Sequence, residues 1–421
     1  MKNILLINPW ESEILPPPAL GYLHSFIQNN CKDTNVIMIN SDEIDLIHTQ
    51  KIDLIGITVN SFSVPALPNL LNKLKNLFPE ARFIAGGHHV TSLPDQILNL
   101  GFDQVVLGPG EKAFIDIING NEEKKIYGSL PELDSIPFPD YHGLSGSWEL
   151  PLYEGGTALP IISSRGCPFK CKFCASSQFW QRKWYPRSPE NVVAEILENL
   201  ETGKMRYWMF SDDNFTLDRK RALRICQLLE ENICKKYPVR WHAASRAESL
   251  ADKELCEAMA HAGCSCVWLG IESGSPNILS LCGKDTSTEK MLKGIAIADS
   301  CGISTVGQFI IGLPGETMDT VKETKAFIQK SKIKITGFNK PWVLPGTYLY
   351  DYSVEKQGID ENIFLKGVPF YTAENSEKVL DDWIGELKTL GRHWPEASFM
   401  VRVKGKMQKL KKLFINNFKR R

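Results

Sequence analysis

The sequence predicts an α/β protein with two parallel sheets in succession, a doubly wound sheet followed by a partial barrel of six βα units. Apolar runs of strand length alternate with helical patterns over residues 1–126 and again over residues 151–350. Between them, SLPELDSIPFPDYHGL is rich in proline and turn formers. We therefore expect residues 127–150 to form an interdomain linker.

The N-terminal alternation fits a Rossmann-like domain with five strands. These are expected within NILLINP, NVIMIN, DLIGITVNSF, ARFIAGG and FDQVVLGPG. Ligands of open parallel sheets bind beyond the carboxyl ends of the strands, where this chain places small or polar residues. The crevice candidates are Thr58, Asn60, Ser61, Gly86, Gly87, His88, His89, Gly108 and Gly110. For the two histidines, which alternate faces if extended, hydrogen bonding in the crevice is favoured over metal ligation.

The second alternation predicts a partial barrel of the TIM type. Its strands are expected in PIISSRGC, RYWMFSDDN, VRWHAASR, SCVWLGIESG, STVGQFIIGLPGE and KITGFNKPWVLPG. Six βα units are too few to close an eight-fold barrel. Active-site residues are again expected at the carboxyl ends of the strands.

Residues 351–421 are less regular, and we expect a small, mostly helical C-terminal region. The final twenty residues contain nine Lys or Arg and no acid. Apolar residues recur opposite that charge at helical spacing: Val403, Met407, Leu410, Phe414 and Phe418. This pattern favours a solvated helix docked by its apolar side, and a docking surface for an acidic peptide or a membrane is the alternative.

The composition argues against several classes of protein. Lys and Arg together number 49 and so do Asp and Glu, so no bulk charge points to nucleic acid or membrane. The N-terminal MKNILLINPW has the length of a strand and no signal-peptide features, and no segment approaches the roughly 20 uninterrupted apolar residues of a membrane span. A cytoplasmic location is therefore expected. Eleven cysteines then indicate reduced thiols or metal ligands.

The segment GCPFKCKFC places Cys167, Cys171 and Cys174 in a C-x₃-C-x₂-C pattern directly after the first barrel strand. A four-iron cluster usually takes four thiolates, so three leave one iron open for a substrate or cofactor. A zinc site completed by a distant residue is the rival, but zinc modules usually offer two C-x₂-C pairs. Lys170, Lys172 and Pro168 indicate an exposed loop, where three idle thiols would be a liability.

On these cysteines, with Phe173 immediately before the last, the sequence resembles the radical S-adenosylmethionine (radical SAM) superfamily. The resemblance implies a 4Fe-4S cluster held by Cys167, Cys171 and Cys174, with S-adenosylmethionine (SAM) chelating the remaining iron. It implies reductive cleavage of SAM to a 5′-deoxyadenosyl radical that abstracts hydrogen from a substrate. An electron donor such as flavodoxin or ferredoxin is the implied partner.

Further strand ends match this family and are expected near SAM. The candidates are Phe173, Asp213, Ser245, Arg246, Glu272, Ser273 and Gly312. Gly312 would let the backbone approach the adenine closely, and LPGT at 344–347 matches the closing signature of the family. A helix cap is the open alternative for Asp213 and for Ser273.

The N-terminal part resembles the cobalamin-binding domain that precedes the radical SAM domain in one large subgroup. The matching segments are PPPALGYL, DLIGITVNSF, AGGHHVTSLP and LGPGE, the last of which adds Glu111 to the cobalamin-contact candidates. The Asp-x-His-x-x-Gly motif that gives cobalt a histidine in other cobalamin proteins is missing from the sequence. The resemblance therefore implies cobalamin without a protein ligand to cobalt.

Together these resemblances imply a C-methyltransferase that acts on an unactivated carbon through a 5′-deoxyadenosyl radical and methylcobalamin. The alternatives are a radical rearrangement or cyclisation with cobalamin non-methylating or absent, and a cobalamin or redox sensor without turnover. A cavity between the domains would hold a small-molecule or peptide substrate. Its lining could include Phe138, Tyr141, His142, Trp180 and Trp184, although packing is the favoured role for each.

Overall fold

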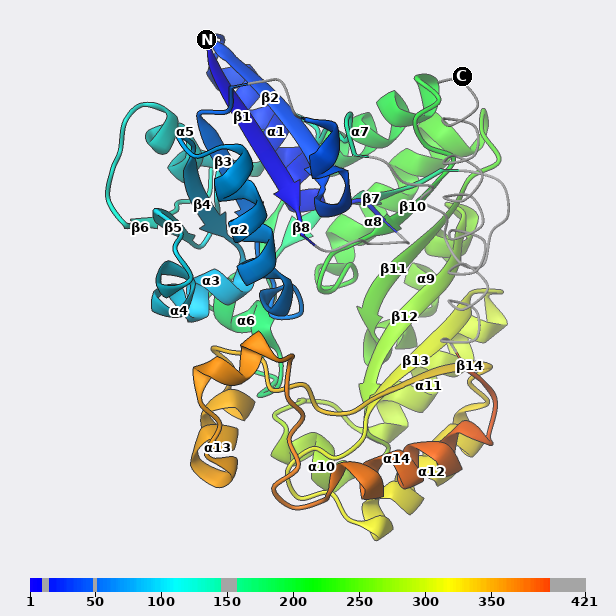
Figure 1. The fold of residues 1–421 in the computed structure, drawn as a ribbon. Helices are drawn as coiled ribbons and strands as arrows, with labels where there is room; N and C mark the ends of the chain where they lie inside the picture. The colour runs from blue at the N-terminus through cyan, green and yellow to red at the C-terminus, as the bar shows by residue number, and fades with distance from the viewer. Residues whose placement is uncertain (10–14, 48–50, 145–156, 394–421) are drawn as a thin grey trace, which may run out of the picture.

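The computed structural model describes residues 1–9, 15–47, 51–144 and 157–393, and every structural statement refers to these residues. The predicted basic tail and the end of the predicted linker lie outside them. Figure 1 shows two sheets side by side, with the C-terminal helices below both.

The N-terminal sheet has six parallel strands in the order β2-β1-β3-β4-β5-β6. Their bounds are Lys2–Asn8 (β1), Thr34–Asn40 (β2), Leu54–Thr58 (β3), Arg82–Gly86 (β4), Gln104–Leu107 (β5) and Lys125–Tyr127 (β6). The prediction of five strands was one short. With only three residues, β6 is too short to show a strand pattern, and it forms because Val105–Leu107 offer it a free edge.

Alternating side chains of β1 supply two separate cores, as period-2 geometry requires of a sheet covered on both faces. Ile4 and Leu6 pack beneath α1 (Pro18–Asn30) and α5 (Glu111–Ile118). Leu5 and Ile7 pack beneath α2 (Leu67–Leu77) and α4 (Pro94–Asn99) on the other face. The doubly wound fold is confirmed.

The second sheet is also parallel, in the order β15-β14-β13-β12-β11-β10-β7. The six predicted strands run over Ala158–Ile161 (β7), Tyr207–Phe210 (β10), Arg240–Arg246 (β11), Cys264–Glu272 (β12), Ser304–Ile310 (β13) and Ile335–Asn339 (β14). A two-residue strand, β15 (Arg392–His393), pairs with the outer edge of β14. The partial barrel is confirmed.

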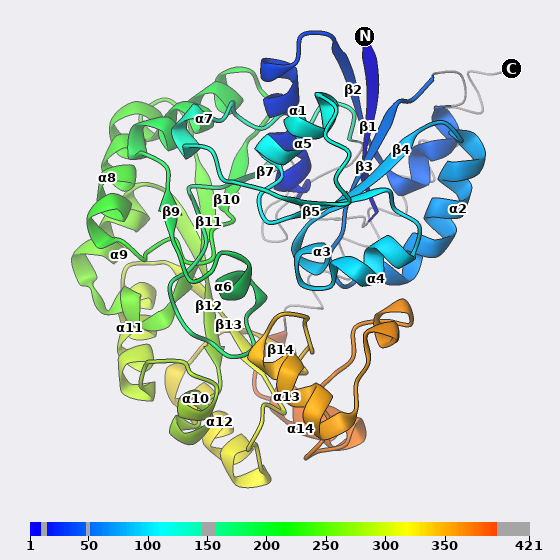
Figure 2. The same cartoon turned by 90° about the vertical axis from the view of Figure 1, so that its left-hand side faces the viewer.

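Helices between successive strands cover one side of this sheet (Figure 2). They are α7 (Pro189–Glu201), α8 (Arg219–Leu229), α9 (Lys253–His261), α11 (Thr288–Ser300) and α12 (Met318–Ser331). A Ser, Asp or Thr side chain accepts a backbone N–H at the start of each. Shorter elements are η1 (Ser41–Leu46), η2 (Val64–Ala66), α3 (His88–Ser92), η3 (Leu133–Ser135), η4 (Glu230–Cys234), η5 (Ala247–Ala251) and α10 (Pro276–Leu281).

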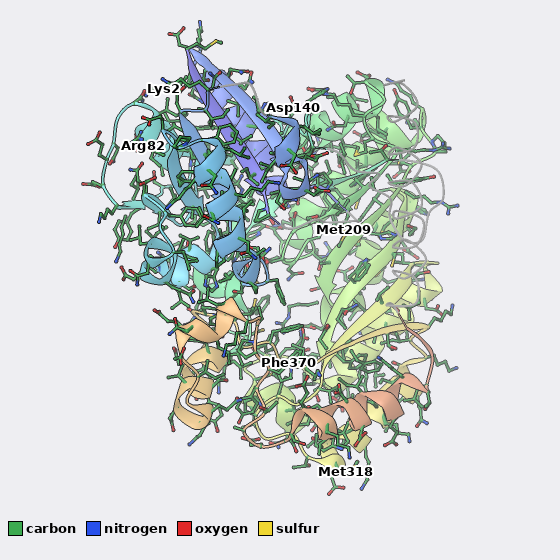
Figure 3. The ribbon with its side chains drawn as sticks, in the orientation of Figure 1. Lys2, Arg82, Asp140, Met209, Met318 and Phe370 are labelled. Atoms are coloured by element: carbon green, nitrogen blue, oxygen red, sulfur yellow. The ribbon has the colours of Figure 1, made fainter. Side chains whose placement is uncertain are left out.

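The C-terminal region touches both sheets. Its elements are α13 (Tyr348–Gln357), η6 (Glu361–Leu365) and α14 (Glu377–Lys388). Phe364 of η6 is buried in the N-terminal core, while Glu386 of α14 accepts from Lys325 of α12 at 2.6 Å. Phe370, labelled in Figure 3, lies in the segment between η6 and α14, and its ring packs on that of Trp342 with centroids 4.2 Å apart.

None of the described helices combines the length and apolar character needed to cross a bilayer.

Helix α11 packs closely on η5, and Gly294 makes that approach possible. A Cβ at Gly294 would lie 1.9 Å from the carbonyl oxygen of Ala247. We expect Gly294→Ala to lower the free energy of unfolding by about 2 kcal/mol or more, because backbone must move to relieve the clash. Gly385→Ala, in α14, is the matched control, since a Cβ there would meet no atom within 4 Å. Because alanine favours the helix over glycine, this change should stabilise the protein by about 0.5–1 kcal/mol. Urea unfolding measures both, and equal effects would contradict the close-packing argument.

Candidate functional site

A cavity of about 400 Å³ lies between the carboxyl ends of the two sheets. Eight of the nine cobalamin-contact candidates line it: Thr58, Asn60, Gly86, Gly87, His88, Gly108, Gly110 and Glu111. The barrel contributes residues next to the cysteine motif, including Arg165, Gly166, Ser176, Phe179, Trp180 and Asp213. The two strand-end crevices inferred from the sequence are therefore parts of one space.

Glycines keep the N-terminal wall of this cavity open. A Cβ added at Gly110 would meet no atom within 4 Å, and at Gly86 the nearest atom would be 3.7 Å away. At Gly87, with φ +120°, a Cβ would lie 2.6 Å from the carbonyl oxygen of Val59. Such a shallow backbone cradle suits a large, flat ligand that approaches the strand ends closely.

The two adjacent histidines have different surroundings, and neither is extended, because both begin helix α3. The ring of His88 faces the cavity and stacks on Phe179 of α6 (Ala175–Phe179), with centroids 4.1 Å apart and planes 11° apart. His88 is exposed to the cavity, and desolvation by the surrounding walls lowers its pKa to about 4, so its imidazole is neutral at neutral pH. His89 is buried and bonds Ser61 Oγ at 3.0 Å and Gln96 Oε1 at 2.6 Å.

Ser61 is the cobalamin-contact candidate that does not line the cavity. The residue is 7% exposed, and its hydroxyl is bound to His89. Asn60 does line the cavity, but its side-chain oxygen accepts the backbone N–H groups of Phe62 and Ser63 at 2.9 and 3.0 Å. Their contacts with cobalamin remain predictions.

One buried ion pair joins the two domains across the cavity wall. Arg165 of β8 (Ser164–Arg165) donates to Glu111 of α5 at 2.6 Å, and both side chains are nearly enclosed. The guanidinium also lies 5.0 Å above the ring of Tyr22. Glu111, expected as a ligand contact, thus fixes the position of β8 directly before the cysteine motif.

The cysteine motif lies in a loop that is closed at its base. β8 pairs antiparallel with β9 (Tyr185–Pro186), so residues 166–184 leave and rejoin the barrel at one point. Gly166 has φ +85°, and a Cβ there would lie 2.3 Å from the carbonyl oxygen of Lys183. Further along, the backbone N–H of Lys172 bonds the carbonyl of Cys282 at 2.9 Å. Glycine is thus required directly before the first cysteine.

The three thiols are half-buried and unpaired. Burial raises the pKa of each, to about 11 for Cys174. At Cys171 the nearby cations Lys284 and Arg246 lower the pKa again. These thiols resist ionisation when no metal is present, while the neighbouring cations favour the thiolate form. Such surroundings suit an anionic metal–thiolate centre.

This arrangement does not form a site for a single metal ion. Within the described parts of the chain, no three His, Cys, Asp or Glu side chains gather closely enough to hold one. The zinc alternative is therefore unsupported, whereas a four-iron cluster is wider and separates its thiolates further. Cys282 lies beside the loop, but its thiol donates to the carbonyl of Leu279 at 3.4 Å within α10.

Two SAM candidates, Arg246 and Glu272, lie beside the cysteine loop. The guanidinium of Arg246 lies 4.0 Å above the ring of Phe169 and donates to the carbonyl of Asp285 at 2.9 Å. Glu272 has φ +65° at a bulge that ends β12, and it accepts from Lys284 at 3.1 Å. A left-handed conformation in a residue that is not glycine is strained and is often found at binding sites.

The other SAM candidates make contacts within the protein. The hydroxyls of Ser245 and Ser273 are buried and bond Thr216 and Thr324, respectively. Phe173 packs among Ile278, Leu313 and Val343. A Cβ at Gly312, with φ +103°, would lie 2.6 Å from Leu380 of α14, so the close approach seen here is to that side chain. SAM contact by these residues remains a prediction.

Of the aromatic and histidine side chains proposed to line a shared cavity, Trp180 does so. Tyr141 is buried against Gly21, where a Cβ would lie 2.4 Å from its ring. Phe138 and Trp184 lie beneath Arg187 and Arg221, and His142 bonds Asp140 at the seam between the domains (Figure 3). Packing, the favoured interpretation, fits Phe138, Tyr141 and Trp184, whereas the side chain of His142 is 73% exposed and is neither packed nor part of the cavity lining.

Sequence reasoning missed Arg165, Ser176 and Phe179 as cavity residues. Arg165 and Ser176 are separated by one residue from the first and last cysteines, so extending the strand-end argument to the flanks of the motif would have found them. Phe179 carried no signal, because its position depends on how α6 packs against α3.

Comparison with known proteins assigns both parts of the chain. The model of the radical SAM superfamily matches residues 161–328, and that of the B12 binding domain matches residues 13–118. An uncharacterized methyltransferase of Pyrococcus horikoshii is 30% identical over 390 residues, which cover 84% of this chain and 83% of the relative. The chain belongs to the radical SAM superfamily. It is a radical SAM enzyme with a B12 binding domain, and its cofactors are a 4Fe-4S cluster, SAM and cobalamin.

Two further similarities bear on the fold and the reaction. An anaerobic magnesium-protoporphyrin IX monomethyl ester cyclase of Rubrivivax gelatinosus is 26% identical over 343 residues, covering 73% of this chain and 61% of the relative. The structure of TsrM, a radical S-adenosylmethionine methyltransferase from Kitasatospora setae, has a TM-score of 0.70 and 18% identity over 84% of this radical SAM enzyme and 76% of TsrM. The latter confirms the fold.

We expect Glu111→Gln to destabilise the apo enzyme by about 3 kcal/mol, because it leaves the buried guanidinium of Arg165 without a charged partner. The control is Glu257→Gln, which removes one side of the exposed Lys253–Glu257 pair and should cost at most about 0.5 kcal/mol. Urea unfolding of both variants tests this. Similar small losses would show that the interdomain pair contributes little.

Proposed function

We propose that this enzyme is a cobalamin-dependent C-methyltransferase that methylates an unactivated carbon. The observation that carries the proposal is a single cavity with two kinds of wall. One wall is the backbone at Gly86, Gly87, Gly108 and Gly110, called the glycine cradle, and the other is formed by the flanks of the cysteine loop. Radical methyl transfer needs both cofactors to reach one substrate atom. The similarity to a methyltransferase of Pyrococcus horikoshii supports methyl transfer as the outcome.

In this proposal Cys167, Cys171 and Cys174 hold the cluster, and Arg246 and Glu272 lie near SAM. The glycine cradle of β4 and β5 would receive cobalamin, with His88 on the wall as a neutral ring rather than a charged one. When bound, these groups supply reductive cleavage of SAM and delivery of a methyl group. The protein orients them and encloses the reacting atoms, which limits side reactions with water.

A radical cyclisation or rearrangement is the second candidate. The similarity to the Rubrivivax gelatinosus cyclase favours it, because that relative shares most of this chain. Neither the cavity nor the cysteine loop separates the two reactions. The substrate, a small molecule or peptide, and the electron donor are further parts of the proposal.

We expect anaerobically reconstituted enzyme to hold close to four irons and to lose them when Cys167, Cys171 or Cys174 is replaced by Ala. Cys282→Ala is the matched control, because this buried cysteine adjoins the loop but its thiol points into α10. Iron analysis, with SAM cleavage by dithionite-reduced enzyme, measures the result. A cluster that depends equally on Cys282 would mean four cysteine ligands and no open iron for SAM.

Product analysis separates the candidate reactions. A methyltransferase should produce S-adenosylhomocysteine and 5′-deoxyadenosine together with a methylated product, because one SAM supplies the methyl group and another the radical. We expect the formation of S-adenosylhomocysteine to require hydroxocobalamin. Deoxyadenosine with unmethylated product, unaffected by cobalamin, would instead identify a cyclisation or rearrangement.

A further inference from the structure

Two adjacent aspartates after β10 bind the chain on both sides of the first cysteine. Asp212 is buried and accepts the backbone N–H and the hydroxyl of Ser163 at 2.7 and 2.6 Å, and also the hydroxyl of Ser164. Asp213 accepts the hydroxyl of Ser176 at 2.6 Å, and the backbone N–H of Gly166 lies near enough to lower the pKa of its carboxyl. The end of β10 therefore holds the strand before the motif and, separately, the motif itself.

The two residues beside Asp213 flank all three cysteines in the sequence. Gly166 immediately precedes Cys167, and Ser176 follows Cys174 by two residues. Asp213, Gly166 and Ser176 also line the cavity. One carboxylate thus lies near the start of the cysteine segment, is bonded just beyond its end, and forms part of the wall that the segment shares with the cavity.

This wall continues into the N-terminal domain. Ser176 lies in α6, and Phe179 of the same helix stacks on His88 at the edge of the glycine cradle. A shift of the cysteine segment would therefore move a side chain that borders the cobalamin crevice. Hydrogen bonds to an ionised acceptor are among the stronger ones, which suits a carboxylate to this fixing role.

The simpler role of helix capping does not apply to Asp213. Helix α8 begins at Arg219, and its N-cap is Asp218, whose side chain accepts the backbone N–H of Arg221. Asp213 lies five residues earlier, and its bonds run to the cysteine segment instead. Asp218 thus caps helix α8, whereas Asp213 holds the cysteine loop.

We propose that Asp213 is a positioning residue that fixes the cysteine segment as a wall of the cobalamin cavity, acting through its hydrogen bond with Ser176. The inference rests on the proposed cofactor sites and adds a physical link between them. It predicts that weakening this fastening lowers the affinity for cobalamin, even though the cluster cysteines and the glycine cradle are unchanged.

Two variants release the segment from opposite sides. Asp213→Asn removes the charge and replaces one acceptor oxygen by an NH₂ group, which cannot accept a hydrogen bond from Ser176. Ser176→Ala leaves the carboxylate intact and removes its side-chain partner. Asp218→Asn is the control, because it makes the same change in the same segment, and asparagine caps helices as well as aspartate.

The measurements are hydroxocobalamin titration by absorbance, iron content, and the electron paramagnetic resonance spectrum of the reduced cluster. We expect Asp213→Asn and Ser176→Ala each to raise the dissociation constant for hydroxocobalamin about fivefold, the effect of losing about one hydrogen bond. Both should keep their iron but show altered cluster spectra. Asp218→Asn should match the wild type in all three measurements.

Unchanged hydroxocobalamin affinity in both variants would overturn the inference. So would an effect confined to Asp213→Asn, because the carboxylate would then act directly on a cofactor rather than through the loop. If Asp213→Asn loses iron, Ser176→Ala alone decides the outcome. Wild-type enzyme that holds iron but does not bind hydroxocobalamin would overturn the proposed function and this inference together.

Discussion

The buried pair of Arg165 and Glu111 is the interaction on which the relation between the two sheets depends. Each side chain carries a charge that would be costly to bury alone, and each finds its partner on the other domain. A second enclosed pair, Arg187 with Glu195, lies nearby, and Arg187 also donates to the hydroxyl of Tyr22 at 3.1 Å. Because these charges are satisfied in one orientation of the domains, the carboxyl ends of both sheets face one cavity.

Paired charges also surround the cysteine loop. Lys284 is enclosed and balanced by Glu272, while Arg246 is balanced by Glu248, yet both cations also act on Cys171. The site therefore combines cations that are held in place with thiols whose own ionisation is unfavourable. An arriving anionic cluster would gain interactions from groups already positioned, with little rearrangement to oppose binding.

Much of this arrangement could be predicted from sequence, because it follows from local periodicity and from one topological rule. Strand patterns predicted both sheets, and seven of the nine crevice candidates chosen by the strand-end rule line the cavity. The failures concern side chains whose direction depends on distant partners. Ser61 turns towards His89, and Gly312 meets Leu380, a residue 68 positions away in the sequence. No local pattern encodes such contacts.

The return of the chain at β15 has a consequence for the molecule in solution. A partial barrel leaves its outermost parallel strands with exposed backbone N–H and C=O groups, which can pair with another chain. Here Arg392 and His393 lie along β14 at Ile335 and Thr336, after the chain has passed through α13, η6 and α14. The C-terminal region thus covers part of a strand edge that could pair with another chain, so its loss would favour self-association as well as uncover both cores.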